Sequence, residues 1–307
     1  MSEKILIVGS ANIDMVVRSE RFPEAGETIL GGEFQMHKGG KGANQAVAAA
    51  KLGGNVSFIC KLGNDEFGDL CTEQYKDVGI NVDNILFDED RPTGVAMISV
   101  NMTGENKIVV APGANHGITR NEIKNLKDVI VSFDLLVLQL EIPIEIVGLI
   151  LEIAREGKTK VILNPAPALE LPNYFFKDLF LVTPNQNEAE KLTGIHIADS
   201  ESLRSSAKSL QELGVKNVVI TLGSDGVFMK TEESEGIIPA QEVIVEDTTA
   251  AGDVFNGALS TAIIQGQSLR NAIKFANMAA ALSVSRNGAQ SSIPTIDELQ
   301  GFISDKS

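Results

Sequence analysis

Short apolar runs alternate with segments of helical periodicity along most of the chain. The apolar runs predict buried strands at 5–8, 56–60, 135–138, 161–163, 179–182 and 218–221. The intervening segments predict helices at 44–52, 66–78, 144–156, 188–192 and 200–213, followed by two alanine-rich helices at 253–265 and 269–285. Strands that are apolar on both faces and separated by helices are typical of parallel sheets. We therefore expect an α/β fold with a mostly parallel central sheet and helices on both faces.

Two segments, 14–34 and 93–110, interrupt this alternation. Apolar and polar residues alternate within them, which predicts hairpin strands with one exposed face. Neither segment is long enough to form a domain, so we expect one α/β domain over residues 1–307 with a small antiparallel β lid inserted. Because an exposed sheet often finds a partner, the lid is also the expected contact of a homodimer.

Composition and charge narrow the class of protein. The chain has 307 residues with 26 basic and 41 acidic side chains, which give a formal net charge of −15. This acidity argues against nucleic acid or an anionic membrane as the main partner, but a site built from backbone amides can still bind a small anion. Tryptophan is absent and aromatic residues make up only 5% of the chain, so it has no stacking platform for single-stranded nucleic acid.

Two further observations concern the compartment. Cys60 and Cys71 lack metal-ligand spacing and cannot form a disulfide framework, so we expect reduced thiols. The N-terminus runs directly into a predicted strand rather than a signal peptide, and no apolar run reaches the ~18 residues that a membrane helix needs. We therefore expect a cytoplasmic protein.

A loop of small residues, 247–253, directly precedes a predicted helix and ends in Asp253. Small residues let backbone N–H groups converge on an anion, and a helix N-terminus adds partial positive charge there. A carboxylate at such a site would repel a bound phosphate unless it had another task. We expect Asp253 to take a proton from a hydroxyl that attacks phosphorus. The alternative is an ordinary N-cap aspartate after a flexible loop.

Two polar motifs lie near the start of the chain. The segment 39–44 contains three glycines at the start of a predicted helix, and Lys41 and Asn44 supply donors beside it. Its spacing is not that of a P-loop. Asn12 and Asp14 follow the first strand, and their alternation lets both project to one side, as a polyhydroxyl ligand requires. Structural turns are the alternative for both motifs. The absence of Gly-x-Gly-x-x-Gly after this strand disfavours dinucleotide binding.

Three more motifs follow later strands. Glu141 is either a ligand contact or the N-terminal carboxylate of the next helix. Asn185 and Glu188 share one face of a helix start, where they either orient water on Mg²⁺ or form a capping box. Residues 221–226 suit either nucleotide phosphates or a plain hairpin turn. Because ligands bind at the carboxyl ends of strands in such sheets, we expect all five polar loops to gather at one crevice.

Two long segments resemble the signatures of the ribokinase-like (PfkB) carbohydrate kinases. They are Gly39-Gly-Lys-Gly-Ala-Asn-Gln-Ala46 and Asp247-Thr-Thr-Ala-Ala-Gly-Asp-Val-Phe-Asn-Gly257. Thr183-Pro-Asn-x-x-Glu188 resembles the magnesium-associated motif of that family, and the order and spacing fit over essentially the whole chain. Asn164-Pro-Ala-Pro167 and Arg286-Asn-Gly-Ala-Gln290 are most similar to members that act on D-ribose.

The resemblance implies ATP-dependent phosphorylation of D-ribose at its 5-hydroxyl. Kinases of the same fold that act on deoxyribose, fructose or a nucleoside such as adenosine are the first alternatives. Low aromatic content counts weakly against a nucleoside, because a base favours a stacking partner. A non-catalytic sugar-binding protein is the alternative from another class, and it would need no base at position 253.

The resemblance also implies site residues, group by group. The base would be Asp253, and the anion-hole amides would be Ala250, Ala251 and Gly252. The sugar would contact Asn12, Asp14, Gly40, Lys41, Asn44 and Glu141. The nucleotide site would be lined by Asn185, Thr221, Gly223, Ser224, Gly226 and Asn277. Glu188, with Asn185, would act through Mg²⁺ and its waters.

The family also uses a monovalent cation, usually K⁺. The residues that match this site, several through backbone carbonyls, are Asp247, Thr249, Ser283, Arg286, Gly288 and Ser292. This chain has Thr249 where the second signature often has a branched apolar residue. If the carbonyl is the ligand, that difference should matter little.

Overall fold

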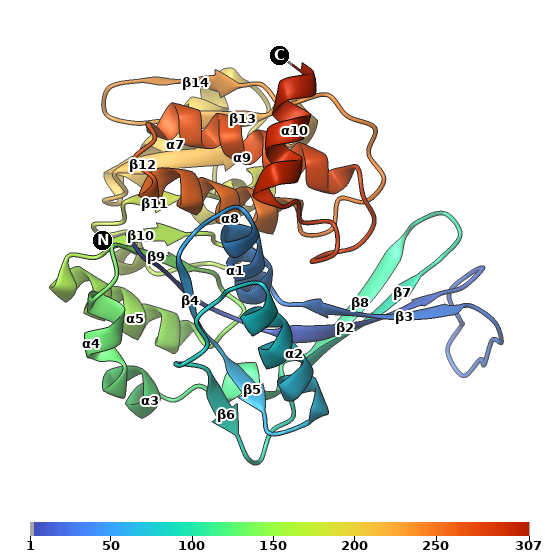
Figure 1. Cartoon of the computed structure of the whole chain (residues 1–307). Coiled ribbons are helices and arrows are strands. Elements are labelled where there is room, and N and C mark those ends of the chain that lie inside the picture. The colour runs from blue at the N-terminus through green and yellow to red at the C-terminus, as the bar shows by residue number, and fades with distance from the viewer. Residues whose placement is uncertain (1–2, 307) are drawn as a thin grey trace.

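An eight-stranded sheet forms the centre of the computed structural model, which describes residues 3–306 (Figure 1). Its strand order is β14-β13-β12-β11-β10-β9-β1-β4. The parallel strands are β1 (Ile5–Val8), β4 (Val56–Ile59), β9 (Leu135–Leu138), β10 (Lys160–Leu163), β11 (Leu181–Val182) and β12 (Asn217–Thr221). Two antiparallel strands, β13 (Val227–Lys230) and β14 (Glu235–Ile238), complete one edge. The predicted mostly parallel sheet is confirmed.

Helices cover both faces of this sheet. One face carries α1 (Lys41–Lys51), α2 (Glu66–Asp77), α8 (Ala251–Ile264), α9 (Leu269–Val284) and α10 (Ile296–Lys306). The other carries α3 (Arg120–Asn125), α4 (Lys127–Val131), α5 (Ile144–Gly157), α6 (Gln186–Thr193) and α7 (Ser200–Glu212). Successive strand residues point to opposite faces, so Ile5 and Ile7 pack with the first group while Leu6 packs with the second.

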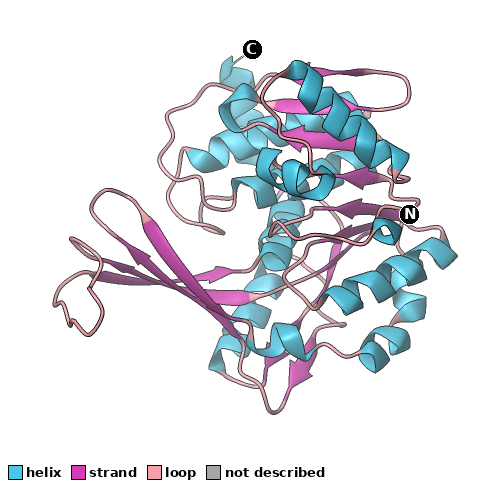
Figure 2. Ribbon diagram, turned by 180° about the vertical axis from the view of Figure 1, so that it is seen from behind, coloured by secondary structure: helices cyan, strands magenta, loops and turns pink. Residues whose placement is uncertain are grey.

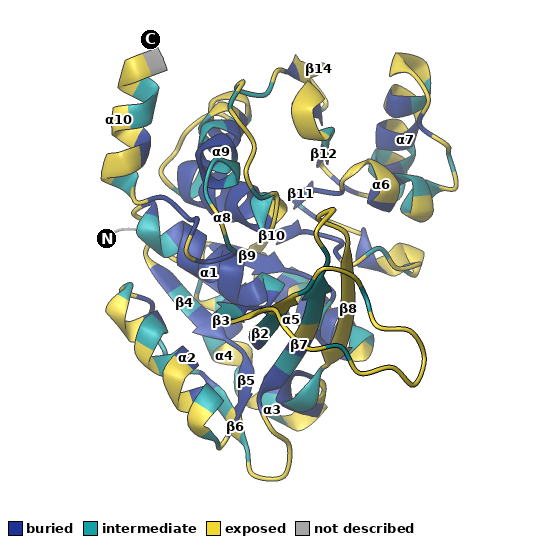
Figure 3. Cartoon of the chain, turned by 90° about the vertical axis from the view of Figure 1, so that its right-hand side faces the viewer, coloured by how far each residue is buried: buried dark blue, intermediate teal, exposed yellow. Residues whose placement is uncertain are grey.

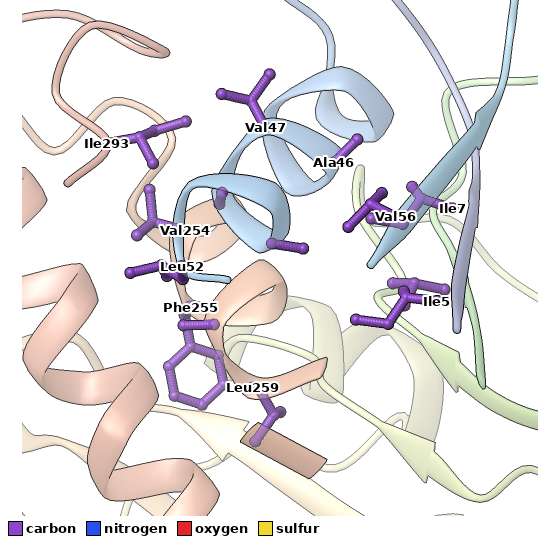
Figure 4. Packing of buried hydrophobic residues seen from close by; sticks show 14 of the residues in the cluster. Ile5, Ile7, Ala46, Val47, Leu52, Val56, Val254, Phe255, Leu259 and Ile293 are labelled. Carbon is purple, nitrogen blue, oxygen red and sulfur yellow. The ribbon is translucent and has the colours of Figure 1, made fainter. Parts of the chain in front are cut away.

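The core between α1 and α8 positions the site. Figure 4 shows Ala46 and Val47 of α1 in the same buried cluster as Val254 and Phe255 of α8. Small alanine side chains let the two helix axes approach closely. The N-termini of α1 and α8 are therefore held together, although they come from opposite ends of the chain.

A second, four-stranded sheet extends away from the central sheet (Figures 1 and 2). Its order is β3-β2-β7-β8, from β2 (Asn12–Arg18), β3 (Glu33–Gly39), β7 (Gly94–Val100) and β8 (Asn106–Ala111). The two predicted hairpins are present as β2–β3 and β7–β8. They join through a parallel β2–β7 pair, with Asn12 opposite Gly94. Figure 3 shows that β8 is exposed, in contrast to the buried strands of the central sheet.

The remaining elements are short. A two-stranded sheet pairs β5 (Lys61–Gly63) with β6 (Leu86–Asp88) in parallel. Three 3₁₀ turns span Gly113–Gly117, Asn173–Phe175 and Gly223–Asp225. Cys60 and Cys71 are buried and free of disulfides, as expected. Within residues 3–306, every helix is too short or too polar to cross a membrane.

Some element boundaries differ from the predictions. The helix expected at 44–52 begins at Lys41, because Gly40 takes a positive φ of 89° and turns the chain directly into the helix. The helix expected at 253–265 begins at Ala251. Only Leu181–Val182 of the strand expected at 179–182 pairs within the sheet. The first two shifts place the ends of the two motifs, residues 41–44 and 251–253, in first helical turns.

Candidate active site

Polar side chains follow five adjacent strands of the central sheet, β1, β9, β10, β11 and β12, at the edge where each strand ends. A cavity of about 230 Å³ is lined by the loops after β10, β11 and β12 and by the N-termini of α1, α6 and α8. Its lining residues are Lys41, Asn164, Ala166, Thr183, Asn185, Glu188, Thr221, Thr248, Ala250, Ala251, Gly252, Asp253 and Asn256. The lining includes members of four predicted groups, namely the base with its anion hole, the sugar, the nucleotide and the magnesium residues, but Asn12, Asp14 and Glu141 do not line it.

Asp253 lies in the first turn of α8, on the wall of this cavity. The N-cap of the helix is Ala250, so the interpretation of Asp253 as an ordinary N-cap aspartate is wrong. The carboxylate is 6% exposed and accepts hydrogen bonds of 3.0 Å from both Asn44 Nδ2 and Gln45 Nε2. Burial raises the pKa of Asp253, while Lys41 and the two amide donors act in the opposite direction.

The small residues before Asp253 form the adjoining wall. Ala250 adopts a left-handed conformation with φ of 61°, which L-residues rarely take and which costs about 1 kcal/mol. Ala251 N donates to Thr248 O at 3.2 Å, and space is open beside Gly252, where an added Cβ would meet nothing within 4 Å. The first N–H groups of a helix lack partners within the helix. This turn can therefore bind an anion.

Gln45 was not predicted as a site residue, yet it holds the carboxylate of Asp253. It is fully buried, and its Nε2 also donates to Asn164 Oδ1 at 2.9 Å. Its Oε1 accepts from Gln139 Nε2 at 2.6 Å. The available signal was its place directly after Asn44 in the first signature.

Asn256 was missed as well. Asn164 Nδ2 donates to Thr183 O, and Thr183 Oγ1 donates to Asn256 Oδ1 at 2.6 Å. Asn256 Nδ2 in turn donates to Gly252 O at 2.8 Å. Its spacing of three residues from Asp253 on one helix face was the signal that could have identified it. These bonds hold the start of α8 against the ends of β10 and β11.

The predicted sugar residues lie beside Asp253. Asn12 is 5% exposed and accepts from Asn115 Nδ2 at 2.8 Å. Asp14 lies against Gly39, where any side chain would overlap its carboxylate. Burial raises the pKa of Asp14 to about 6, and the neighbouring Glu141 and Asp253 add to this shift. Neither Asn12 nor Asp14 lines the 230 Å³ cavity.

Glu141 bridges two of the predicted motifs. Its Oε2 accepts from Ser10 Oγ at 2.6 Å and from Lys41 N at 3.0 Å. The N-cap of the next helix is Pro143, so Glu141 is not the capping carboxylate of that helix. The Lys41 side chain lines the cavity. Burial lowers the pKa of Lys41, but Asp253 and the other nearby carboxylates outweigh this effect and leave it raised.

Asn185 and Glu188 form the expected capping box and also line the cavity. Asn185 Oδ1 accepts from Glu188 N, and Glu188 Oε2 accepts from Asn185 N, each at 2.8 Å, which makes a capping box on α6. Both residues also line the cavity. Burial raises the pKa of Glu188, and its hydrogen bond from Asn185 and the charge of Lys41 oppose this.

The other nucleotide candidates are more dispersed. Thr221 lines the cavity, whereas Gly223, Ser224 and Gly226 lie in the turn between β12 and β13 and do not line it. Leu222 N donates to Gly226 O at 2.8 Å, so this segment is also a hairpin turn. Asn277 of α9 is 9% exposed, and its Nδ2 donates to Pro239 O at 3.2 Å.

The predicted cation residues lie in the last turn of α9, at Ser283, and on two loops that Asp247 joins. Its carboxylate accepts from Thr249 N at 2.8 Å and from Gly288 N at 2.9 Å. Ser283 O accepts from Arg286 N at 3.0 Å. The Arg286 side chain pairs with Glu298, and Ser292 Oγ donates to Ala289 O.

The two predicted cation sites differ in the oxygen donors that they can offer to a cation. Within residues 3–306, no cluster of three or more His, Cys, Asp or Glu side chains could hold a metal ion. The carboxylate of Glu188 and the amide of Asn185 are oxygen donors at the cavity wall, which suits Mg²⁺ that keeps its waters and meets phosphate. Around Asp247 the carboxylate is engaged by backbone amides, so backbone carbonyls are the donors left for a monovalent cation.

Comparisons with known proteins agree with this geometry. Residues 2–296 match the model of the pfkB family carbohydrate kinases. Ribokinase of Haemophilus influenzae is 41% identical over 99% of this chain and 99% of its own length. The bifunctional ribokinase/ribose-5-phosphate isomerase A of Fructilactobacillus sanfranciscensis is also 41% identical over 98% of this chain, which spans 56% of that protein. Deoxyribokinase of Salmonella typhi is 36% identical over 98% of both chains.

The solved structures agree with the sequence comparisons. Ribokinase of Arabidopsis thaliana, complexed with ribose and ATP, superposes with a TM-score of 0.91 at 31% identity over 99% of both chains. The family match spans nearly the whole chain, and it coincides with the two signatures that meet at Asp253. The chain therefore belongs to the pfkB family of carbohydrate kinases and is an ATP-dependent sugar kinase.

Proposed function

We propose that this kinase transfers the γ-phosphoryl group of ATP to the 5-hydroxyl of D-ribose, which yields D-ribose 5-phosphate and ADP. The observation that carries the proposal is the buried carboxylate of Asp253, held by Asn44 and Gln45 in the first turn of α8. Similarity to ribokinases over nearly the full length supports ribose as the acceptor.

In the proposed reaction, Asp253 accepts the proton of the sugar hydroxyl as its oxygen attacks the γ-phosphorus. The new O–P bond forms while the bond to the β,γ-bridging oxygen breaks, and ADP leaves with the electron pair. Phosphoryl transfer depends mainly on positioning and on stabilisation of developing charge. The amides of Ala250, Ala251 and Gly252 supply that stabilisation at the helix N-terminus, where Ala251 N exchanges its bond to Thr248 O for one to the phosphoryl oxygen. The ammonium group of Lys41 adds positive charge.

The acceptor is held by side chains around the base. Asn12, Asp14 and Glu141 offer amide and carboxylate groups to vicinal hydroxyls, and the backbone at Gly40 allows close approach. The nucleotide would lie toward Asn185 and Thr221, on the cavity wall, and reach the residues of the 223–226 turn and Asn277. Deoxyribose, fructose or a nucleoside are the competing acceptors. A purely sugar-binding role is disfavoured, because it needs no buried base.

An ATP-dependent kinase uses a divalent metal with its nucleotide, and we propose Mg²⁺ in that role. Glu188 and Asn185 would hold it through its waters, and the ion would neutralise charge on the phosphates. We also propose K⁺ behind the anion loop. Its ligands would come from two loops and include backbone carbonyls: Asp247, Thr249, Ser283, Arg286, Gly288 and Ser292. There it would orient the loop amides.

The four-stranded sheet is proposed as a lid that excludes water and as the contact of a homodimer. Support for the dimer comes from exposed apolar side chains that the strand register places on one face of the sheet: Val17, Phe34, Met36, Met97 and Val109. Ile108 and Val110 are exposed on the opposite face. A second copy of this sheet would cover such a face. We propose that residues 1–307 work as one domain with this lid inserted. Free thiols at Cys60 and Cys71 and the use of ATP support a cytoplasmic location.

The acceptor is tested with a coupled ADP-release assay across ribose, 2-deoxyribose, fructose and adenosine. Phosphorus NMR of the product identifies the phosphorylated hydroxyl. Ribose should give the highest kcat/KM and a 5-phosphate ester. A clear preference for another acceptor, or a product phosphorylated elsewhere, contradicts the proposal. Asp253→Asn serves as the inactive control.

A further inference from the structure

Gln290 is a buried side chain to which the proposed mechanism gives no task. It lies in the loop between α9 and α10 and is 5% exposed. Its Nε2 donates to Asn44 Oδ1 at 3.0 Å, and its Oε1 accepts from Gln74 Nε2 at 2.8 Å. Gln290 thus links α2 to a residue that touches the base.

The direction of these bonds follows from the charge of Asp253. An ionised carboxylate only accepts hydrogen bonds, so Asn44 must present Nδ2 to it. The Oδ1 of Asn44 then points away and needs a donor in a buried site. Gln290 supplies that donor, and Gln74 satisfies the remaining oxygen of Gln290. Each amide in the series therefore determines the orientation of the next.

We infer that Gln290 is a positioning residue for phosphoryl transfer: it holds Asn44 with its amide donor toward Asp253 Oδ2. The inference rests on the proposed function, because it assumes that Asp253 is the base. Gln45 holds the other oxygen, Oδ1. Without Gln290, the Asn44 amide can rotate and present its oxygen, and one of the two restraints on the carboxylate is lost.

Loss of this restraint has a pH signature. Asp253 faces charged groups from four elements: Lys41 of α1, Asp14 of β2, Glu141 after β9 and Glu188 of α6. All four are unchanged in Gln290→Met, whereas Gln290→Glu adds a carboxylate near the site whose charge would itself raise the pKa of Asp253. A hydrogen bond donated to a carboxylate favours its ionised form, so losing the Asn44 donor raises the pKa of Asp253. The acid limb of the kcat/KM profile then moves to higher pH.

Two variants test the inference. Gln290→Met keeps the side-chain length but removes both the donor and the acceptor, and Gln290→Glu keeps only the acceptor for Gln74. We expect kcat to fall about 10- to 100-fold in both, since a displacement of about 1 Å can cost ~10²-fold. The KM for ATP should stay within about 2-fold, because ground-state nucleotide binding is untouched. The acid limb should move to higher pH.

Lys51→Met is the matched control. Lys51 Nζ donates to Gln290 O at 3.4 Å and to Ile293 O at 3.0 Å, so it supports the same loop through the backbone alone. This variant should lower the melting temperature while the acid limb and kcat stay near those of the parent. An equal loss of kcat in this control, with no pH shift in the Gln290 variants, would assign Gln290 a structural role only.

The outcomes separate this inference from the proposed function. A parent enzyme that phosphorylates no sugar contradicts the proposed function itself. An active parent whose folded Gln290→Met variant keeps its kcat and pH profile overturns only the inference. If Gln290→Met does not fold, as judged by circular dichroism, Gln290→Glu decides by its kcat and its KM for ATP alone, because its added charge also shifts the pH profile. In an Asp253→Asn background, Gln290→Met should cause little further loss of kcat, because both substitutions act through the carboxylate of Asp253.

Discussion

Gln45 Nε2 and Asp253 Oδ1 are 3.0 Å apart, so a glutamine of the first signature donates directly to the carboxylate of the second. Gln45 is fully buried and makes two further hydrogen bonds.

We expect Gln45→Leu to lower the free energy of unfolding by about 1–3 kcal/mol for each polar group left unpaired, and to lower kcat as well. Urea unfolding and steady-state kinetics measure the two effects. Gln139 is one hydrogen bond further from Asp253, so Gln139→Leu should destabilise the fold with a smaller loss of kcat. A larger loss of kcat in Gln139→Leu than in Gln45→Leu would contradict this prediction.

Asp253→Asn keeps the size of the side chain but removes the proposed proton acceptor. A well-placed general base contributes ~10²–10⁴-fold in rate, so we expect kcat to fall by at least that order. Sugar binding, measured by calorimetry, should change much less. A variant with near-normal kcat would show that the proton leaves by another route.

Asp14 makes stability depend on pH. Its folded-state pKa of about 6 lies above the ordinary 3.8, so its contribution is fully present below about pH 4 and is lost as pH rises through about 6. Asp14→Asn should therefore stabilise the unliganded protein at pH 8 by up to about 3 kcal/mol, with little difference at pH 4. Urea unfolding at both pH values checks this. Equal stability at pH 8 would mean that the carboxylate is not destabilised by its surroundings.

The polar side chains of Asn12 and Asp14 should distinguish ribose from 2-deoxyribose. A site built to hydrogen-bond a hydroxyl rejects analogues that lack it, because its own polar groups are left unpaired. We expect kcat/KM to be roughly 10- to 100-fold higher for ribose. Competition between the two sugars in one reaction measures the ratio directly. A ratio near one would show that the 2-hydroxyl is not recognised.

Activity should depend on a monovalent cation. Asp247 joins the loop before α8 to the loop at Gly288, and an ion between such loops would orient the anion-hole amides, of which a single lost donor can cost ~10²-fold. We expect saturable activation by K⁺ and weaker activation by Na⁺, measured in buffers whose only other cation is a bulky organic one. Equal effects of both salts would indicate ionic strength alone. Full activity without either would rule out the cation.

The layout of the central sheet was predictable because its strands are apolar on both faces and alternate with helices. The two signatures were also recognisable, because both are long and stand in the order and at the spacing of the family whose model matches residues 2–296. The two hairpins of the four-stranded sheet were predictable from the alternation of apolar and polar residues. The parallel β2–β7 pair was not predictable, because nothing local at Asn12 specifies Gly94 as its partner.

The network of side-chain hydrogen bonds around Asp253 was the least predictable part of the site. Gln45, Gln139 and Gln290 look like ordinary polar residues in sequence. Their roles arise only when segments far apart in the chain meet, and local spacing contains no information on that meeting. Asn185 illustrates a different limit of sequence reasoning. Its spacing from Glu188 is compatible with a helix cap and with a ligand-binding residue, and in the structure Asn185 caps α6 and also lines the cavity.

The contacts of Asp253 also constrain how the enzyme can be made. Asn44 lies 209 residues before Asp253, and Gln290 lies 246 residues after Asn44. During synthesis on the ribosome, α1 emerges long before its partners and must wait for almost the entire chain. A nascent chain that ends before Gln290 can already contain both signatures and the central sheet, yet it lacks the donor that holds Asn44 Oδ1. If Asp253 is the base, a fragment truncated before this loop should therefore be a poor enzyme even where it binds nucleotide.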